Sequence, residues 1–578
     1  MGNAIVAHRL AIMTQQEQPQ QERAQQQRTP TPIDALAEEW VDIQLDLAPE
    51  WHVWLGRPGR EGEYSDLSPE GADRVAQAQA DMLRRIEAAE PVDEIDRVTK
   101  LDLARDLQLE VEKHDAGFEQ RNLNVIASPE QELRDIFDLE PTATVENWEN
   151  IARRMHNLPA AMRGYIATLR TGIHAGNVPA IRQVREGIAQ ANKQVGPSGF
   201  FFSLARDAKP AEGELPEGLK RDLEKGAAEA AAAYGELAVF LEDELAVHAP
   251  EQDAVGREIY ALASRSFLGA TVDLDETYEW GVEELRRMVE EQEAIAREIK
   301  PGASVAEAIA FLDGDPSRKL HGTDALQRWM QETSDRAVEE LGRTHFDIPE
   351  PVRRLECMIA PTQEGGIYYT GPADDFSRPG RMWWSVPEGV TEFDTWRELT
   401  TVYHEGVPGH HLQIATATYN KAQLNTWRRV AGTSGHAEGW ALYAERLMEQ
   451  LGYLDDPADR LGMLDGQRMR AARVVLDIGV HLTKQRPDGQ GPWTGDYAFE
   501  FLGQNVNMNE PFVRFEVNRY LGWPGQAPSY KIGQRIWEQI RDEYQRREGD
   551  AFDIKAFHKK ALDIGGVGLD TLKTALLS

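Results

Sequence analysis

Long stretches with the apolar periodicity of amphipathic helices follow one another along this chain, and they limit the folds that it can adopt. One such helix is expected to open at Ser68-Pro69-Glu70, where a capping serine and a first-turn proline precede apolar residues at three- and four-residue intervals. Another is expected to open at Thr31, and further long amphipathic stretches lie near residues 94–116, 145–174, 216–247, 274–299 and 322–343. Helix and strand patterns do not alternate, which argues against a doubly wound sheet. We predict a mainly α fold, a large helical body with a deep cleft.

The beginning of the chain has a different composition. Residues 14–32 are rich in Gln, carry Pro and charge, and show no apolar period, so we predict that residues 1–32 form a disordered leader. No low-complexity linker interrupts residues 33–578. We therefore expect one helical domain there, which can comprise two lobes, with the functional site within about residues 350–578.

Charge and cysteine content restrict the partners and the compartment. The net charge of −34 argues against nucleic acid and anionic membranes as partners, because phosphate binding needs a basic surface. No apolar run is long enough to cross a bilayer, and residues 1–13 make no convincing signal peptide. The single cysteine, Cys357, excludes an internal disulfide framework and is expected to be a buried thiol. These features predict a cytoplasmic protein. They leave its oligomeric state open, with a homodimer as one option.

The strongest candidates for a metal-binding or catalytic site lie at residues 403–411, which read Tyr-His-Glu-Gly-Val-Pro-Gly-His-His. Imidazoles can hold a metal ion, and a carboxylate beside them can activate water, as in a zinc hydrolase. The usual motif places the second histidine four residues after the first, on the same helix face. In this chain that position is Pro408.

The spacing around Pro408 is incompatible with a regular helix that carries two ligands on one face. On an undistorted helix His410 would point about 120° away from His404, and His411 would lie about 10.5 Å further along the axis. A proline inside a helix clashes with the preceding turn, and the glycines on both sides relax the backbone. We therefore predict a widened or broken turn that brings a later histidine back toward His404.

A second acidic segment follows about one helix later. Glu438 and Glu445 are seven residues apart, so they lie close to one face of a helix, two turns from each other. The small and apolar residues around them suit a buried carboxylate pair. One carboxylate can ligate the metal while the other orients a ligand histidine. An ordinary amphipathic helix with exposed glutamates is the alternative.

The run from His404 to Gln413, His-Glu-Gly-Val-Pro-Gly-His-His-Leu-Gln, resembles the signature of a bacterial family known as domain of unknown function 885. That family is similar in fold to the carboxypeptidase Taq family of zinc metallopeptidases, and more distantly to the thimet-oligopeptidase-like peptidases. Those relatives carry His-Glu-x-x-His, followed by a Glu-x6-Glu helix whose first glutamate ligates zinc.

The resemblance implies a set of metal ligands. Glu438 and Glu445 match the second helix of those relatives in spacing, so Glu438 is expected to ligate one zinc ion together with His404. A two-residue insertion makes His410 the second histidine ligand, with His411 as the alternative. Glu445 is expected to support a ligand or to replace one.

The resemblance also implies catalytic residues. Glu405 is expected to take a proton from water and to return it to the leaving amine. The segment Pro524–Gly533 resembles a peptidase loop whose tyrosine faces the zinc, so the hydroxyl of Tyr530 is expected to stabilise an oxyanion, with His481 as the alternative. A loop tyrosine packed between prolines is an equally compatible reading of Tyr530.

Arginines downstream are candidates for binding substrate. Arg473, Asp477 and His481 recur every four residues along one predicted helix, in apolar surroundings that suggest partial burial of this polar stripe. A C-terminal carboxylate of a substrate would need an arginine, whose fork can donate two hydrogen bonds. Arg473 and Arg519 are expected to serve, and Arg514 is a further candidate.

Two short strands are predicted upstream of the metal motif. Residues 365–372 and 381–386 are joined by a turn rich in Pro, Gly and Asp, which predicts a small antiparallel hairpin or sheet beside the metal-site helices. Its exposed edge could bind a peptide by strand addition, and a purely structural hairpin is at least as compatible.

These features favour a zinc-dependent, carboxypeptidase-like hydrolase that cuts peptide or small amide substrates. A non-haem iron enzyme is one alternative, because two histidines and a carboxylate also bind iron. A non-catalytic scaffold with a metal site is another.

Overall fold

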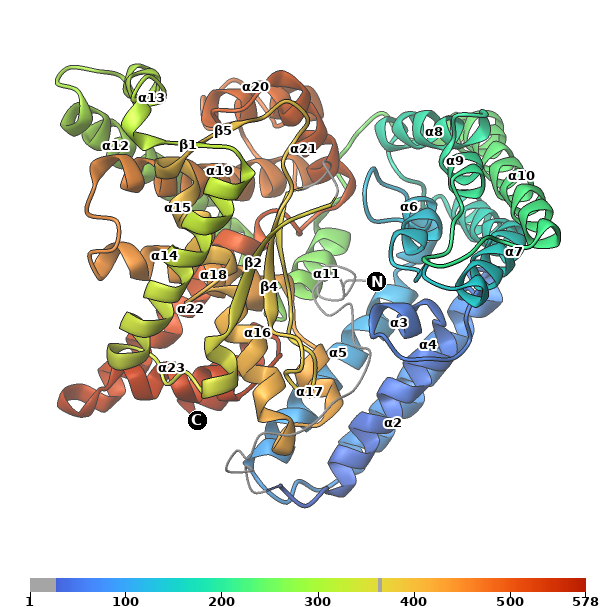
Figure 1. The fold of residues 1–578 in the computed structure, drawn as a ribbon, viewed down its shortest axis with the longest axis horizontal. Coiled ribbons are helices and arrows are strands. Elements are labelled where there is room, and N and C mark those ends of the chain that lie inside the picture. Colours follow the sequence, from blue (N-terminus) through green and yellow to red (C-terminus); the bar gives the residue numbers. More distant parts are fainter. Residues whose placement is uncertain (1–26, 362–365) are drawn as a thin grey trace.

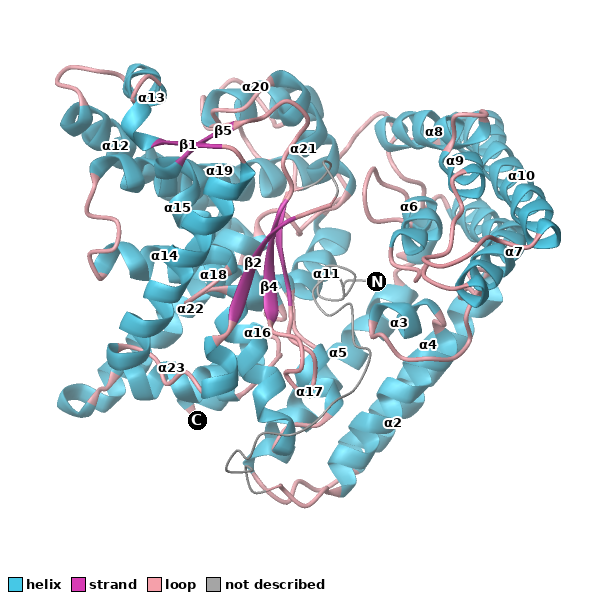
Figure 2. Cartoon of the chain, viewed as in Figure 1, coloured by secondary structure: helices cyan, strands magenta, loops and turns pink. Residues whose placement is uncertain are grey.

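The computed structural model describes residues 27–361 and 366–578, and it is mainly α-helical, as predicted (Figure 1). The strands are few and short (Figure 2). Residues 1–26 of the predicted disordered leader lie outside the described residues. None of the helices in the described ranges has the length and apolar composition that crossing a bilayer requires.

The first described helices form a group with its own small apolar core, which includes Ile33, Trp40 and Leu107. This group consists of α2 (Pro32–Leu47), α3 (Glu50–Trp54), α4 (Pro69–Ala88) and α5 (Glu94–Asp115). The predicted starts at Thr31 and Ser68 are confirmed, since both side chains cap their helices and a proline follows each.

The chain is anchored before α2 begins, at Arg28. Its guanidinium donates to Asp93 at 2.7 and 2.9 Å and to Asp96 at 2.6 Å. It also pairs with Asp34 in the first turn of α2. The prediction that residues 1–32 are disordered is therefore wrong for residues 28–32, because Arg28 binds three aspartates and α2 begins at Pro32.

A second group of helices packs around a separate apolar core that includes Trp148, Tyr165, Tyr234 and Leu237. In Figure 1 this group lies on the right. It consists of α6 (Pro129–Asp135), α7 (Val145–Ala175), α8 (Ile181–Val195), α9 (Phe200–Arg206) and α10 (Glu217–Phe240).

The remaining helices share the largest core and carry the candidate site. The first of them are α11 (Arg257–Leu268), α12 (Leu274–Ile299), α13 (Val305–Asp313), α14 (Thr323–Thr344), α15 (Thr395–Glu405) and α16 (His410–Tyr419); α17 (Thr426–Val430), which comes next in the chain, packs against α2 instead, and its Trp427 belongs to the core of the first group. They are followed by α18 (Ser434–Gln450), α19 (Pro457–His481), α20 (Gly495–Asn505), α21 (Glu510–Gly522), α22 (Ser529–Glu548), α23 (Ile554–Asp563) and α24 (Leu569–Leu577).

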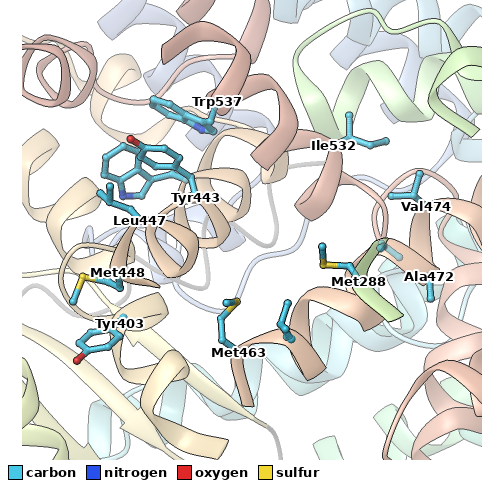
Figure 3. Packing of buried hydrophobic residues seen from close by; sticks show 14 of the residues in the cluster. Met288, Tyr403, Tyr443, Leu447, Met448, Met463, Ala472, Val474, Ile532 and Trp537 are labelled. Atoms are coloured by element: carbon cyan, nitrogen blue, oxygen red, sulfur yellow. The ribbon is translucent and has the colours of Figure 1, made fainter. Parts of the chain in front are cut away.

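The packing of this core fixes the helices that surround the site. Figure 3 shows Tyr443 of α18 near Trp537 of α22, and Met288, Met463 and Val474, further away in the same view, belong to the same buried cluster. Helix α19 packs against both α12 and α15, and α18 packs against α22. These contacts hold α15, α18, α19 and α22 around one region of the molecule.

A small sheet lies beside α15 and α16. The predicted strands are confirmed as β3 (Ile367–Thr370) and β4 (Gly380–Trp384), which pair antiparallel. A third strand, β2 (Leu355–Ile359), was not predicted, and it pairs parallel with β4 to give the order β2-β4-β3. A separate two-stranded sheet joins β1 (Lys319–His321) to β5 (Glu392–Asp394).

The two edges of the larger sheet differ. Side chains of α14 cover the outer edge of β2: Gln331 bonds to the backbone of Leu355 and Cys357, and Gln327 donates to the carbonyl of Cys357. The thiol of Cys357 is buried, as predicted. Strand β3 forms the opposite edge and pairs only with β4 among the described strands.

Candidate metal centre

The helix that carries the histidine motif is interrupted where the sequence predicted a break. Helix α15 ends at Glu405 and α16 begins at His410. In a continuous helix the carbonyl of Tyr403 would accept from the amide four residues later. It accepts instead from the amide of Gly409, six residues later, at 3.0 Å. The linker thus contains two extra residues, and His410 takes the place that residue 408 would have on a continuous helix.

The linker is closely packed at both of its sides. A Cβ atom on Gly409 would lie 1.9 Å from the carbonyl oxygen of His404, so only glycine fits there. On the other side, the indole N–H of Trp440 on α18 donates to the carbonyls of Pro408 at 2.9 Å and of Gly409 at 3.2 Å. No pattern in the sequence indicated this anchoring role of Trp440.

Three ligand atoms converge beside the linker. His404 Nε2 and His410 Nε2 each lie 3.3 Å from Glu438 Oε2, and the three ligand atoms all lie within 4.8 Å of one another. Two ligands at about 2.1 Å from a tetrahedral zinc ion would be about 3.4 Å apart. All three residues are buried. Their separations and their donor set therefore fit one shared divalent ion.

Glu445 supports the first of these histidines. His404 Nδ1 lies 2.7 Å from Glu445 Oε1, and the hydroxyl of Thr400 donates to Glu445 Oε2 at 2.9 Å. A proton on Nδ1 leaves Nε2 as the nitrogen with a free lone pair, directed to the cluster. Sequence reasoning missed Thr400, although it precedes His404 by four residues and so shares its helix face.

The carboxylates around His404 control its protonation. Burial lowers the pKa of His404, but hydrogen bonds with Glu438 and Glu445 and the charge of the adjacent Glu405 outweigh it and raise the pKa to about 9. Glu405 is buried at the C-terminal end of α15. In the protonated ring Nε2 also carries a proton, so a metal ion must displace that proton to bind Nε2 of His404.

His411 points away from the cluster. Its Nε2 lies 2.7 Å from the carbonyl oxygen of Val352, so Nε2 carries the proton, and its Nδ1 accepts from the hydroxyl of Tyr369 at 2.8 Å. Burial lowers the pKa of His411 to about 4 and keeps the ring neutral. Both ring nitrogens are thus engaged within the protein, and the group of potential ligands contains His410 and not His411.

Tyr530 lies in the first turn of α22 and not in a loop. Helix α22 approaches α18 closely through glycines, because a Cβ atom on Gly439 would lie 2.4 Å from the backbone of Gly533. The hydroxyls of Ser434 and Ser529, one on each helix, are 2.8 Å apart. Tyr530 is therefore next to the helix that supplies Glu438.

The two arginines expected to bind a substrate carboxylate are already paired. Arg473 Nη2 lies 2.9 Å and Arg519 Nη2 2.8 Å from the same oxygen of Glu516. Arg473 also donates to the hydroxyl of Tyr520 at 2.7 Å. All four residues are buried. We therefore correct the expectation: Arg473 and Arg519 form an internal charged network, while the remaining candidate, Arg514, is exposed.

His481 is also part of the interior. Its side chain is 0% exposed, its ring stacks on Tyr260, and its Nε2 lies 3.1 Å from the carbonyl oxygen of Tyr520. Burial lowers its pKa to about 4. Asp477, one turn earlier, accepts from the hydroxyl of Tyr260 and from the amide of Gly525. The expectation that His481 stabilises an oxyanion is thereby corrected, since these contacts place it in the core.

A model of the family described as "Bacterial protein of unknown function (DUF885)" matches residues 49–576, and the chain belongs to this family. A comparison with curated protein sequences gives no match.

Two solved structures share the fold over nearly their whole length. One, from Colwellia psychrerythraea, is provisionally called a lipoprotein; it is 20% identical, with a TM-score of 0.80 over 94% of this chain and 98% of that chain. The other, from Shewanella oneidensis, is provisionally called a lipoprotein of unknown function; it is 17% identical, with a TM-score of 0.75 over 95% of this chain and 100% of that chain. An oligoendopeptidase F from Bacillus anthracis, also provisionally named, is 12% identical with a TM-score of 0.32. The cytoplasmic location of this chain stays a prediction.

Proposed function

We propose that the protein is a zinc-dependent hydrolase of peptide or amide bonds. The observation that carries this proposal is the group of His404 Nε2, His410 Nε2 and Glu438 Oε2, with Glu405 adjacent to the first ligand. Zinc held by two imidazoles and one carboxylate supplies Lewis-acid chemistry, because it lowers the pKa of water to about 7 and polarises a carbonyl group.

The side chains around the metal position orient a ligand, transfer a proton and stabilise the developing negative charge. Glu445 and Thr400 orient His404, so that its Nε2 stays directed to the cluster. Glu405 accepts a proton from the attacking water and returns it to the leaving nitrogen. The hydroxyl of Tyr530 donates a hydrogen bond to the oxygen on which negative charge develops.

The edge strand β3 offers a way to hold an extended substrate. A peptide laid along β3 would bond to backbone groups that face away from β4, and backbone bonds hold a chain in register without selecting its side chains. The proximity of β3 to both α15 and α16 supports this placement.

The same donor set serves non-haem iron enzymes, which leave coordination positions open for oxygen and a substrate. Glu405 favours hydrolysis, because a general base directly after a ligand histidine has a task in water activation and none in that iron chemistry. Metal analysis of the purified protein, together with activity after loading with zinc or with iron, distinguishes the two.

The decisive variant is Glu405→Gln. We expect it to keep one metal ion per chain and to lose hydrolysis of a peptide and amide library by about 10²- to 10⁴-fold, the usual contribution of a general base. Glu388→Gln, on an exposed loop, removes the same charge and should behave as the wild type. Unchanged hydrolysis by metal-loaded Glu405→Gln would exclude the mechanism.

A further inference from the structure

A small pocket lies between α16, α18 and the loop that joins α23 to α24. Its volume is about 50 Å³. One water molecule needs about 10–15 Å³, whereas sites for drug-sized ligands span about 300–1,000 Å³. The pocket therefore has the size for one small chemical group of a ligand and not for a whole ligand.

The pocket continues along α16 from the candidate metal centre. Gln413 and Ala417, which line it, follow His410 at intervals of three and seven residues and so share its face of the helix. Gln413 is about 4.5 Å beyond His410 along the helix axis. Ala437, another lining residue, directly precedes Glu438 on α18. A group in the pocket would thus belong to a part of the ligand next to the metal position.

Two side chains of the pocket wall have a nitrogen without a partner. His436 is 4% exposed, and its Nε2 forms no hydrogen bond with any of the described residues. The Nε of Arg429, which carries a proton, is buried and equally unpaired among them. A buried donor without an acceptor is unfavourable, so an acceptor brought into the pocket would stabilise the complex.

The contacts of His436 define which of its nitrogens carries the proton. The side-chain amide nitrogen of Gln413 lies 3.4 Å from the carbonyl oxygen of His436 and 3.5 Å from its Nδ1. Only the NH₂ end of an amide suits that carbonyl, so Nδ1 accepts from the same group. Nε2 of the neutral ring therefore carries the proton and is a donor.

Gln413 also provides an acceptor. With its amide nitrogen turned to His436, its Oε1 is the opposite end of the group, and this oxygen has no partner among the described residues. It is absent from the buried unpaired atoms of residues 27–361 and 366–578, so it is accessible. The wall thus offers both donors and one acceptor.

The charges around the pocket favour a neutral ligand group. No acidic side chain is among the described residues that line it, and its cation is already paired, because Arg429 Nη1 lies 2.7 Å from Asp374 Oδ1. A carboxylate would bring two acceptors toward the free Oε1 of Gln413 and would be repelled there. A carboxamide presents one acceptor oxygen and one NH₂ donor without charge, which complements this wall.

We propose that this pocket binds the side-chain carboxamide of an asparagine that flanks the scissile bond of the substrate. This inference rests on the proposed function and narrows its substrates to peptides with asparagine beside the bond that is cut. His436 Nε2 and Arg429 Nε donate to the amide oxygen, which has two lone pairs, and Gln413 Oε1 accepts from the NH₂ group. Ile414 and Ala417 enclose the apolar part of the side chain.

Side chains of equal size test the proposal. Pentaalanine is made with one residue replaced, position by position, by Asn, Asp or Leu, and each peptide is titrated by calorimetry into zinc-loaded Glu405→Gln. Leu resembles Asn in size without its polar atoms, and Asp has its shape with a charge. We expect Asn at one position to bind about 10-fold more tightly than Leu or Asp, the range of one or two net hydrogen bonds. Equal binding of Leu, or tighter binding of Asp, would overturn the proposal.

Two variants assign the selectivity to the pocket. His436→Phe, made in the Glu405→Gln background, keeps a ring and removes both nitrogens, so the preference for Asn over Leu should fall below threefold. Ala417→Leu fills the pocket and should weaken both peptides about 10-fold while pentaalanine binds as before. Ala294→Leu, on the exposed face of α12, is the matched control and should bind every peptide as its parent does. Full Asn selectivity in either pocket variant would place its origin elsewhere and overturn the proposal.

The failure of this inference and that of the proposed function are distinguishable. Asn-selective binding that requires His436 supports the pocket even if the wild type hydrolyses no peptide, which would overturn the hydrolase alone. Hydrolysis by the wild type without Asn-selective binding would overturn the pocket and leave the hydrolase standing. The absence of both would overturn both.

Discussion

Glu445 Oε1 lies 2.7 Å from His404 Nδ1, and this contact decides which nitrogen of the histidine faces Glu438. A carboxylate accepts and cannot donate when it is ionised, so the shared proton stays on Nδ1 when the other nitrogen binds a metal. The geometry of the centre therefore depends on a residue that need not touch the ion.

Removing that support should weaken metal binding without removing the site. In Glu445→Ala, His404 loses its orienting partner and Thr400 loses its acceptor, so we expect zinc affinity to fall by about 10- to 100-fold. Competition with a chromophoric chelator measures this change. Glu449→Gln, one turn later on α18, is the matched control and should bind zinc as the wild type does. Unaltered affinity in Glu445→Ala would show that Glu445 has no orienting role.

The two adjacent histidines should respond differently to substitution. His410→Ala removes a ligand, so we expect the metal content to fall from one ion per chain to a small fraction after dialysis. His411→Ala leaves the hydroxyl of Tyr369 and the carbonyl of Val352 without a partner, which should lower the free energy of unfolding by about 2–4 kcal/mol and leave one ion per chain. Metal analysis and chemical denaturation measure the two effects. The reverse pattern would make His411 the ligand.

The stability of the metal-free protein should depend on pH through His404. Its pKa is raised from 6.5 to about 9, so its contribution is fully present below pH 6.5 and is lost as the pH rises through 9. That shift corresponds to about 3 kcal/mol. We expect the unfolding free energy of metal-free protein to fall between about pH 6.5 and 9, and that of zinc-loaded protein to fall less, because the metal replaces the proton.

A variant isolates this contribution from those of other groups. His404→Gln should remove the decline between about pH 6.5 and 9, while the titration of every other group remains. A decline of equal size in the variant would assign the effect to another residue.

Two variants of the linker at residues 406–409 test whether its two extra residues set the position of His410. Replacing residues 406–409 by two alanines restores the four-residue spacing, so His404 and His410 should still bind one zinc ion. We expect a loss of about 2–4 kcal/mol in stability, because the buried side chain of Val407 and the acceptors of Trp440 are removed.

The control keeps the length of the chain. Four alanines at 406–409 favour a continuous helix, on which His410 points about 120° away from His404, so tight zinc binding should be lost. Isothermal calorimetry measures both variants. Equal zinc binding by the four-alanine variant would mean that the two-residue insertion does not set the position of His410.

Patterns that depend on local spacing were predictable from the sequence. Apolar periodicity and caps located the long helices, and the Pro-Gly interruption located the break between α15 and α16. Strand β2 was missed because Leu355–Ile359 is short and pairs in parallel with a strand that is distant in the sequence. Its pairing depends on the covering helix α14, which no local pattern shows.

Partners of charged side chains were not predictable. Arg473 was expected to bind a substrate carboxylate, but it pairs with Glu516, which comes from another helix, α21. His481 was expected to be partly buried and to stabilise an oxyanion, but Tyr260 of α11 and the backbone of Tyr520 enclose it in the interior.

The hydrogen bond from Gly409 to the carbonyl of Tyr403 has a consequence for aligning such sequences. A motif with a fixed number of residues between its two histidines assumes that both lie on one regular helix. In this chain two extra residues interrupt the helix between the histidines, so the assumption fails. The gap belongs between Glu405 and His410, within a segment that alignment methods usually keep gap-free. Homologues that loop out residues in the same way would pass unnoticed through a motif scan, although their chelating atoms could superpose on those of the ungapped enzymes.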